Sequence, residues 1–358
     1  MHSTPTIAPA RFDDAESALA QVQAIYRNSI GHLRDSLQRF VAGERLPGRV
    51  RACYPYVRIQ TNTVACAESP LSYGFVAGPG QFETTLTRPD LFAGYYLEQF
   101  TLLLKNHSRK QTVQLEIGVS AQPIPVHFSF AEHDHIEGSM TPARRMAMRD
   151  LFDLPDLSAM DDGIANGTKE CGPDEPQPLS LFTGPRVDYS LQRLRHYSGT
   201  APEHFQHFVL FTNYQFYIDE FVRLGHEIMQ RRPDPHAPGE QDQYIAFVEP
   251  GNVVTRRVGH AALTGDELGA APPRLPQMPA YHLIHPGHGG ITMVNIGVGP
   301  SNAKTITDHI SELRPHAWIM LGHCAGLRNS QELGDYVLAH AYVREDHVLD
   351  ADLPVTVP

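Results

Sequence analysis

Two glycine-rich turns follow predicted strands in the C-terminal half of the chain, and both could hold a ligand. The apolar segment 291–296 runs into Gly297 and Gly299, with Ser301 as the expected N-cap of a following helix. Glycines let a backbone approach a ligand closely, and the free N–H groups of a helix start favour an anion or a polar sugar edge. A lone Gly-x-Gly is weak support, because a tight strand-to-helix turn without a ligand has the same pattern.

The second glycine turn follows the apolar run 318–321 and comprises Gly322, His323 and Cys324. If both strands lie in one parallel sheet, both turns open at its carboxyl edge, where ligands of open α/β folds bind. Two turns on one edge support a ligand site better than either alone. A structural histidine and a small buried thiol are the simpler alternatives for His323 and Cys324.

The same residues disfavour an NAD-dependent oxidoreductase and a metal centre. A dinucleotide site requires a third glycine and an acidic residue about 20 positions later, but here the next strand ends in Gly322 and His323. The 20 histidines form no HExxH motif, and the cysteines have no CxxC spacing. We expect no metal, no cofactor, and reduced cytoplasmic thiols at the four cysteines, which are Cys53, Cys66, Cys171 and Cys324.

The elements that must position these turns alternate along the second half of the chain. Short apolar runs precede helical patterns in the order 208–212, 217–229, 291–296, 303–313 and 318–321. This alternation predicts a largely parallel sheet with crossover helices, interrupted by loops at 231–243 and 256–280.

The first half of the chain predicts an α+β domain. A helical stripe over 15–41 has an Asp13-to-Glu16 capping-box spacing and Gly43 as its stop. Strands are expected over 57–63 and around Phe75 and Phe82, followed by a helix from Asp90 to about Asn106 and an extended stretch over 113–130. Residues 153–180, rich in Pro, Gly and Asp, read as a linker, so we divide the chain into domains 1–180 and 181–358.

Composition limits the class of protein and its partners. With 358 residues, 41% hydrophobic and 19% charged, the chain is expected to form two globular domains. A net charge of -11 disfavours a broad electrostatic contact with nucleic acid or with an anionic membrane. No run approaches 18 apolar residues, and the acidic residues near position 14 do not fit a signal peptide. We therefore predict a cytoplasmic protein.

Four runs resemble the AMP nucleosidase family: 188–200, 207–225, VNIGVGPSNAKTITDHI at 294–310, and 318–354. The resemblance implies an N-terminal α+β domain, with a nucleotide or phosphate effector, followed by an α/β catalytic domain like the nucleoside phosphorylases. It also implies a homo-oligomer that hydrolyses AMP to adenine and ribose 5-phosphate.

The resemblance assigns roles to individual positions. Thr212 and Asn213 fall where phosphorylases have their first phosphate loop, and Phe216 is the nearest match to an arginine of that loop. Segments 297–301 and 322–325 resemble the turns beside the ribose and the base, and Met320 and His323 match further phosphate ligands. A 5'-phosphate needs a cationic partner, for which Arg193, Arg195 and His196 are the candidates; a solvated basic helix turn is the alternative.

The catalytic acid is not assigned. In the family the acid that protonates the purine belongs to a later segment, whereas this sequence ends at Pro358, soon after a strand expected over 334–341. The resemblance thus leads us to expect a chain truncated within an incomplete catalytic domain, with little activity of its own. The alternative is a non-catalytic fragment that binds nucleotides or regulates.

Overall fold

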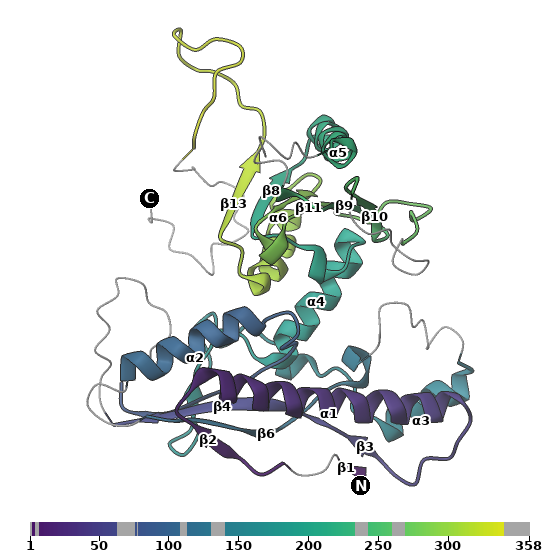
Figure 1. Cartoon of the computed structure of the whole chain (residues 1–358), viewed down its shortest axis with the longest axis vertical. Coiled ribbons are helices and arrows are strands. Elements are labelled where there is room, and N and C mark those ends of the chain that lie inside the picture. Colours follow the sequence, from purple (N-terminus) through teal and green to yellow (C-terminus); the bar gives the residue numbers. More distant parts are fainter. Residues whose placement is uncertain are drawn as a thin grey trace. The chain divides into compact units, whose positions relative to one another are not determined.

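The computed structural model describes residues 2–3, 7–62, 76, 78–107, 113–129, 140–232, 243–259 and 269–339. The chain divides into two compact units, Met1–Tyr189 and Ser190–Pro358 (Figure 1). The division follows Tyr189, within helix α4 (Gly184–Ser198), rather than residue 180. The stretch 153–180, expected as a linker, belongs to the first unit, because its strand β7 (Gln177–Pro178) pairs with β5 (Gly80–Thr85).

The first unit is built on a five-stranded sheet of order β2-β6-β4-β5-β7. Its antiparallel members are β2 (Ala10–Phe12), β6 (Leu115–Pro123), β4 (Cys53–Thr61) and β5, and β7 joins in parallel. Two further strands, β1 (His2–Ser3) and β3 (Val50–Arg51), pair in parallel. The helices are α1 (Ala15–Val41), α2 (Ala93–His107) and α3 (Pro142–Leu151), with 3₁₀ turns η1 (Val126–Ser129) and η3 (Leu157–Ala159).

Helix α1 covers one face of the sheet, and capping residues in its sequence fix where it begins and ends. Its buried stripe, which includes Ile25 and Leu33, packs against β4, β6 and α2 (Figure 1). The N-cap is Asp14, whose carboxylate accepts the N–H of Ser17 at 2.7 Å, so the expected Asp13–Glu16 capping box is wrong by one residue. Gly43, with φ +98°, follows the C-cap and confirms the predicted stop.

The other expectations for this half are confirmed with shifted bounds. The second helix begins three residues later than predicted, because the N–H groups of Leu91 and Phe92 close a turn onto the carbonyl of Arg88. The predicted strands correspond to β4, β5 and β6. Phe75 lies outside the described residues.

The second unit contains a six-stranded sheet of order β10-β9-β11-β12-β8-β13. Strands β8 (Phe208–Thr212), β12 (Ile291–Asn295) and β13 (Ala317–Leu321) are parallel, as predicted. The other half of the sheet is antiparallel and corrects the expectation of a largely parallel sheet: β9 (Ala246–Glu249), β10 (Val253–Arg256) and β11 (Ala280–Ile284). The β9–β10 turn comprises residues 250–252 and has positive φ at Gly251 and Asn252.

Helices cover both faces of this sheet. Val209 and Phe211 of β8 pack in one core cluster with Leu194 of α4 and Ile306 of α6 (Pro300–Ile310). Leu210, which points to the other face, packs in the cluster that contains α5 (Gln215–Gln230). The remaining helical turns are η4 (Pro202–His204), η7 (Pro286–His288) and η8 (Ser311–Leu313). An N-terminal α+β unit followed by an α/β unit agrees with the predicted fold class.

Two further findings concern the chain's ends and surfaces. The strand expected over 334–341 is wrong for its described part, because residues 334–339 form a turn and irregular backbone. Leu333, Tyr336 and Leu338 are highly exposed, so no apolar side of a strand is buried there.

Across the described ranges, no helix has the length and apolarity needed to span a membrane.

Candidate functional site

The carboxyl ends of three parallel strands meet at one edge of the second sheet. β8 lies between β12 and β13, and Thr212 is in register with both Asn295 and Leu321. The turns that follow these strands, at 213–214, 296–299 and 322–324, therefore open on the same edge (Figure 1). The predicted juxtaposition of the two glycine turns is confirmed, and the turn after β8 lies between them.

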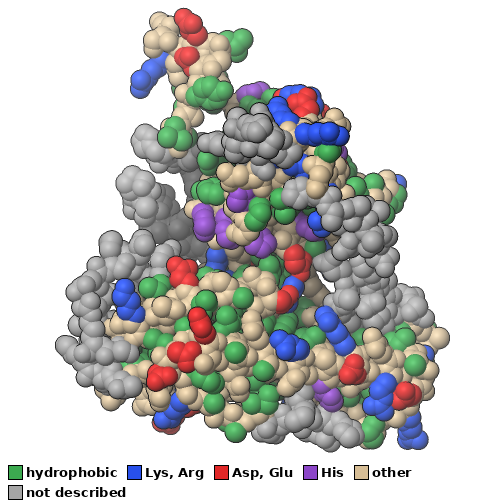
Figure 2. Space-filling view, in the orientation of Figure 1, with side chains coloured by type: hydrophobic (Ala, Val, Ile, Leu, Met, Phe, Trp, Pro, Cys, Tyr) green, Lys and Arg blue, Asp and Glu red, His purple; other side chains and the backbone are tan. Residues whose placement is uncertain are grey.

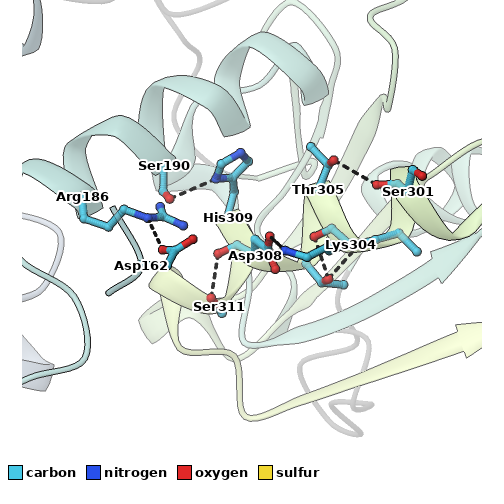
Figure 3. A network of polar contacts seen from close by, with 11 residues as sticks. Asp162, Arg186, Ser190, Ser301, Lys304, Thr305, Asp308, His309 and Ser311 are labelled. Carbon is cyan, nitrogen blue, oxygen red and sulfur yellow. Dashed lines mark hydrogen bonds and ion pairs between the residues drawn. The ribbon is translucent and has the colours of Figure 1, made fainter. Parts of the chain in front are cut away.

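The turn between β12 and α6 requires its glycines. Gly297 and Gly299 have φ +64° and +109°, a region that side chains with a Cβ rarely adopt. Gly299, not Ser301, is the N-cap of α6, because Pro300 already occupies the first helical position. Ser301 is exposed in the first turn, where its carbonyl accepts the hydroxyl of Thr305 at 2.9 Å (Figure 3). The first N–H groups of α6 thus have no side-chain cap.

The turn after β8 is tied to its neighbour by polar contacts. Thr212 is buried, and its Oγ1 accepts the N–H of Tyr214 at 3.1 Å. Its carbonyl accepts the N–H of Ile296 at 2.9 Å. The Asn295 side chain accepts from Gly297 N at 3.0 Å and donates to Gln215 Oε1, at the start of α5, at 3.2 Å. These bonds hold the two turns beside each other.

A group of aromatic rings joins the turn after β8 to the turn after β13. We define the edge aromatic cluster as Tyr214, Phe216, Tyr217 and His323. The His323 ring lies 4.7 Å from Tyr214, 5.2 Å from Phe216 and 5.6 Å from Tyr217, measured between ring centroids. Sequence reasoning had singled out His323 and Phe216 but not Tyr217. The sequence feature that could have indicated Tyr217 is the aromatic run YQFY at 214–217, which follows the end of a predicted strand.

Cys324 and Gly322 complete this third turn. Cys324 is an exposed free thiol, which rules out the alternative of a small buried hydrophobe. A Cβ on Gly322 would lie 3.7 Å from the Tyr214 ring, so the glycine leaves space beside the cluster. Met320, in β13, is exposed.

The cationic candidates lie on α4, and they differ in environment. The Arg193 guanidinium sits 4.5 Å from the centre of the Tyr197 ring and hydrogen-bonds its hydroxyl. Arg195 is half-buried, whereas His196 is exposed with its ring 5.4 Å from that of Tyr197. The alternative of a fully solvated basic helix turn therefore does not hold for Arg193, whose side chain packs on a ring.

The α4 helix is linked to the carboxyl edge through its C-terminal end. The carbonyl of Tyr197 accepts the N–H of Met278 at 2.8 Å, and the carbonyl of Pro279 accepts that of Asn295 at 3.0 Å. The Tyr197 ring stacks on His309, which shares a hydrogen bond of 3.0 Å with Ser190 (Figure 3). Within the described part of the chain, no hydrogen bond joins Arg193 or His196 to the three turns.

The edge itself has no lysine, arginine or carboxylate side chain. Segments 212–216, 296–302 and 322–327 contain no Lys, Arg, Asp or Glu. The groups available to a ligand are backbone N–H groups, the Thr212 and Ser301 hydroxyls, the Asn213 amide and the aromatic rings. Such an edge can bind a sugar or a flat base, and it offers no carboxylic acid. Among the residues that the structure describes, no cluster of His, Cys, Asp or Glu could hold a metal ion.

The first unit has a polar cavity of its own on the outward face of its sheet. Its volume is about 340 Å³, and its lining includes Arg11, Arg58, Gln60 and Glu116. Arg58 is paired with Glu83 at 2.5 Å and with Glu116 at 3.0 Å, so its charge is already balanced. On the face of the first unit that Figure 2 shows, acidic and basic side chains are interspersed.

Three comparisons with known proteins give consistent results. The family model for the "Bacterial AMP nucleoside phosphorylase N-terminus" matches residues 17–176. The AMP nucleosidases of Escherichia coli K12 and O157:H7 are each 41% identical over 348 residues, which covers 95% of this chain and 68% of theirs. The solved AMP nucleosidase of Bacteroides thetaiotaomicron VPI-5482 is 23% identical, with a TM-score of 0.33 over 48% of this chain and 55% of that one. This structural likeness is too slight to support any statement about the site.

Proposed function

The chain belongs to the AMP nucleosidase family, and from this premise we propose that it hydrolyses the N-glycosidic bond of AMP to give adenine and ribose 5-phosphate. The observation that carries the proposal is the 41% identity to curated AMP nucleosidases, which extends over 95% of the chain. The relatives are longer, since the match covers 68% of their length.

The reaction sets the chemical requirements of the site. Water supplies an oxygen to C1′, the C1′–N9 bond breaks with its electron pair going to the purine, and the purine takes up a proton. Because the sugar passes through a state with oxocarbenium character, the site must hold the ribose firmly and shield its charge. We assign the ribose to the turn with Gly297, Gly299 and Ser301, and the base side to Gly322, His323 and Cys324. Thr212 and Asn213 lie between these turns in register.

The 5'-phosphate is assigned to the cations of α4. A phosphate taken from water requires charge-assisted hydrogen bonds, and the edge turns supply no cation. Arg193, Arg195 and His196 are our candidates, from the same subunit or from a neighbour in a homo-oligomer. The Arg193 guanidinium lies over the Tyr197 ring and hydrogen-bonds its hydroxyl, so binding a phosphate would require it to share or exchange that contact. No residue is assigned as the acid that protonates adenine.

The first unit is proposed to act as the regulatory domain. Its polar cavity is one place for a small nucleotide or phosphate effector, although an anion there would have to compete with Glu116 for Arg58. A homo-oligomer in the cytoplasm completes the proposal. The described cysteines are free thiols, in keeping with a reducing compartment.

Adenine release tests the proposal directly. The purified 358-residue chain is incubated with AMP, and free adenine and ribose 5-phosphate are quantified by chromatography, with adenosine as the matched substrate that lacks the phosphate. If the proposal holds, AMP gives equimolar adenine and ribose 5-phosphate, and adenosine gives far less adenine. This outcome is opposite to the little activity that the family resemblance led us to expect of this chain. Turnover of adenosine at the same kcat/KM would contradict the phosphate assignment, and AMP binding without any adenine release would favour a non-catalytic nucleotide-binding module.

A further inference from the structure

We propose that the edge aromatic cluster is a stacking platform for the adenine ring of the substrate. This inference rests on the proposed function and adds to it the residues that recognise the base. Its central member is Phe216, with Tyr214, Tyr217 and His323 as the supporting rings.

Core packing does not explain the position of Phe216. The buried residues of α5 form a stripe that includes Ile218, Phe221 and Gly225. At 100° per residue, Phe216 lies about 160° around the helix from Ile218, and it is 49% exposed. Because Phe216 adjoins three further rings, the exposed apolar surface is a contiguous patch, and such a patch points to a contact with a ligand.

The rings lie together at the place where the turns converge. The planes of Phe216 and His323 are inclined by only 20°, with centroids 5.2 Å apart, and Tyr217 lies 4.2 Å from Phe216. Phe216 and Tyr217 belong to the first turn of α5, whereas His323 follows β13, so two neighbouring strand ends contribute. Both Phe216 and His323 are exposed.

The chemistry of the edge favours the base over the other parts of AMP. With no Lys or Arg in the three turns, a phosphate finds no lysine or arginine partner there and has only neutral N–H and hydroxyl donors besides His323. A purine ring is flat, neutral and polarisable, and base–aromatic stacking is a general source of affinity because every base has a π-face. Ribose offers no such face. The platform is therefore specific for the aromatic part of the ligand.

The test compares three ligands on the full chain by calorimetry: adenine, AMP and ribose 5-phosphate. Phe216→Leu keeps an apolar side chain but removes the ring, Phe216→Trp keeps a ring, and Leu224→Ala is the matched control at another exposed position of α5. We expect Phe216→Leu to weaken adenine and AMP by about 5- to 100-fold, with ribose 5-phosphate unchanged. Phe216→Trp should retain binding, and Leu224→Ala should have no effect. Circular dichroism checks that every variant is folded.

The outcomes separate this inference from the proposed function. Unchanged adenine affinity in Phe216→Leu, no adenine binding by the wild type, or an equal loss for ribose 5-phosphate would each overturn the platform. A different result would separate the two ideas. If Phe216→Leu alone weakens adenine binding, and the wild type binds adenine but releases none from AMP, the platform stands and hydrolysis is rejected.

Discussion

At the residue scale, a buried carboxyl group distinguishes the first unit. Asp188, on α4, accepts hydrogen bonds from the hydroxyls of Tyr54 at 2.6 Å and Thr87 at 2.7 Å. Arg88, whose charge acts on Asp188, is bonded to Asp90 at 2.7 Å. Burial raises the pKa of Asp188 to about 7, although the two hydroxyl bonds and Arg88 lower it in part. This carboxyl group therefore holds a proton in the folded chain at a pH where it would be ionised in the unfolded chain.

This linkage predicts a pH-dependent difference between the wild type and Asp188→Asn. Between about pH 4 and pH 7 the folded state binds more protons at this site, so its contribution to stability is lost as pH rises towards 7 and beyond. The variant lacks this loss. Urea unfolding at pH 5 and pH 8 gives the unfolding free energy of the variant minus that of the wild type. This difference should be larger at pH 8 than at pH 5, by the order of a few kcal/mol. Equal differences in unfolding free energy at the two pH values would contradict the assignment.

At the element scale, helix α1 illustrates how a boundary depends on one hydrogen bond. The sequence contains two adjacent acids, Asp13 and Asp14, and either could start the helix. Asp14 has an extended backbone and accepts the Ser17 N–H, and this bond lowers the pKa of its carboxyl group. The choice between neighbours is made by backbone geometry, which composition does not reveal.

Substitution of the two acids distinguishes their roles. Asp14→Ala removes the N-cap and should lower the melting temperature by about 2–4 °C. Asp13→Ala is the matched control, with the same change of charge one residue away, and should leave the melting temperature nearly unchanged. Differential scanning calorimetry of both variants provides the measurement, and an equal effect of the two substitutions would argue for the capping box instead.

At the scale of the whole molecule, the described sheet of the second unit ends in an open strand. β13 pairs with β8 on one side, and its apolar residues Trp318, Ile319 and Met320 are 45%, 54% and 49% exposed. Open edges with exposed apolar side chains promote association between molecules.

A lysine on this strand should reduce self-association. For Ile319→Lys we expect the weight-average sedimentation coefficient to rise less with protein concentration than in the wild type. Leu181→Lys, at an exposed position in the first unit, is the matched control for added charge. A concentration series in the analytical ultracentrifuge provides the measurement. The idea fails if Leu181→Lys has the same effect or if the wild type shows no association at all.

The sequence by itself determined the features that depend on near neighbours along the chain. Helical stripes, the strand-to-helix order around β8, β12 and β13, and the left-handed glycines at 297 and 299 follow from local periodicity and backbone conformational limits. The family resemblance, carried by long runs of residues, was also readable at this level.

Only the tertiary structure decided the features that depend on contacts between distant segments. Strands β9, β10 and β11 lie beside the Pro/Gly-rich segments 231–243 and 256–280, and they become strands by antiparallel pairing with one another and with β12. Thr212 takes its place between the two glycine turns through register with Asn295 and Leu321. Phe216 and His323 are more than a hundred residues apart in sequence, and they stack because two parallel strands end side by side. No local pattern encodes that proximity, since strand order is set by burial of both sheet faces.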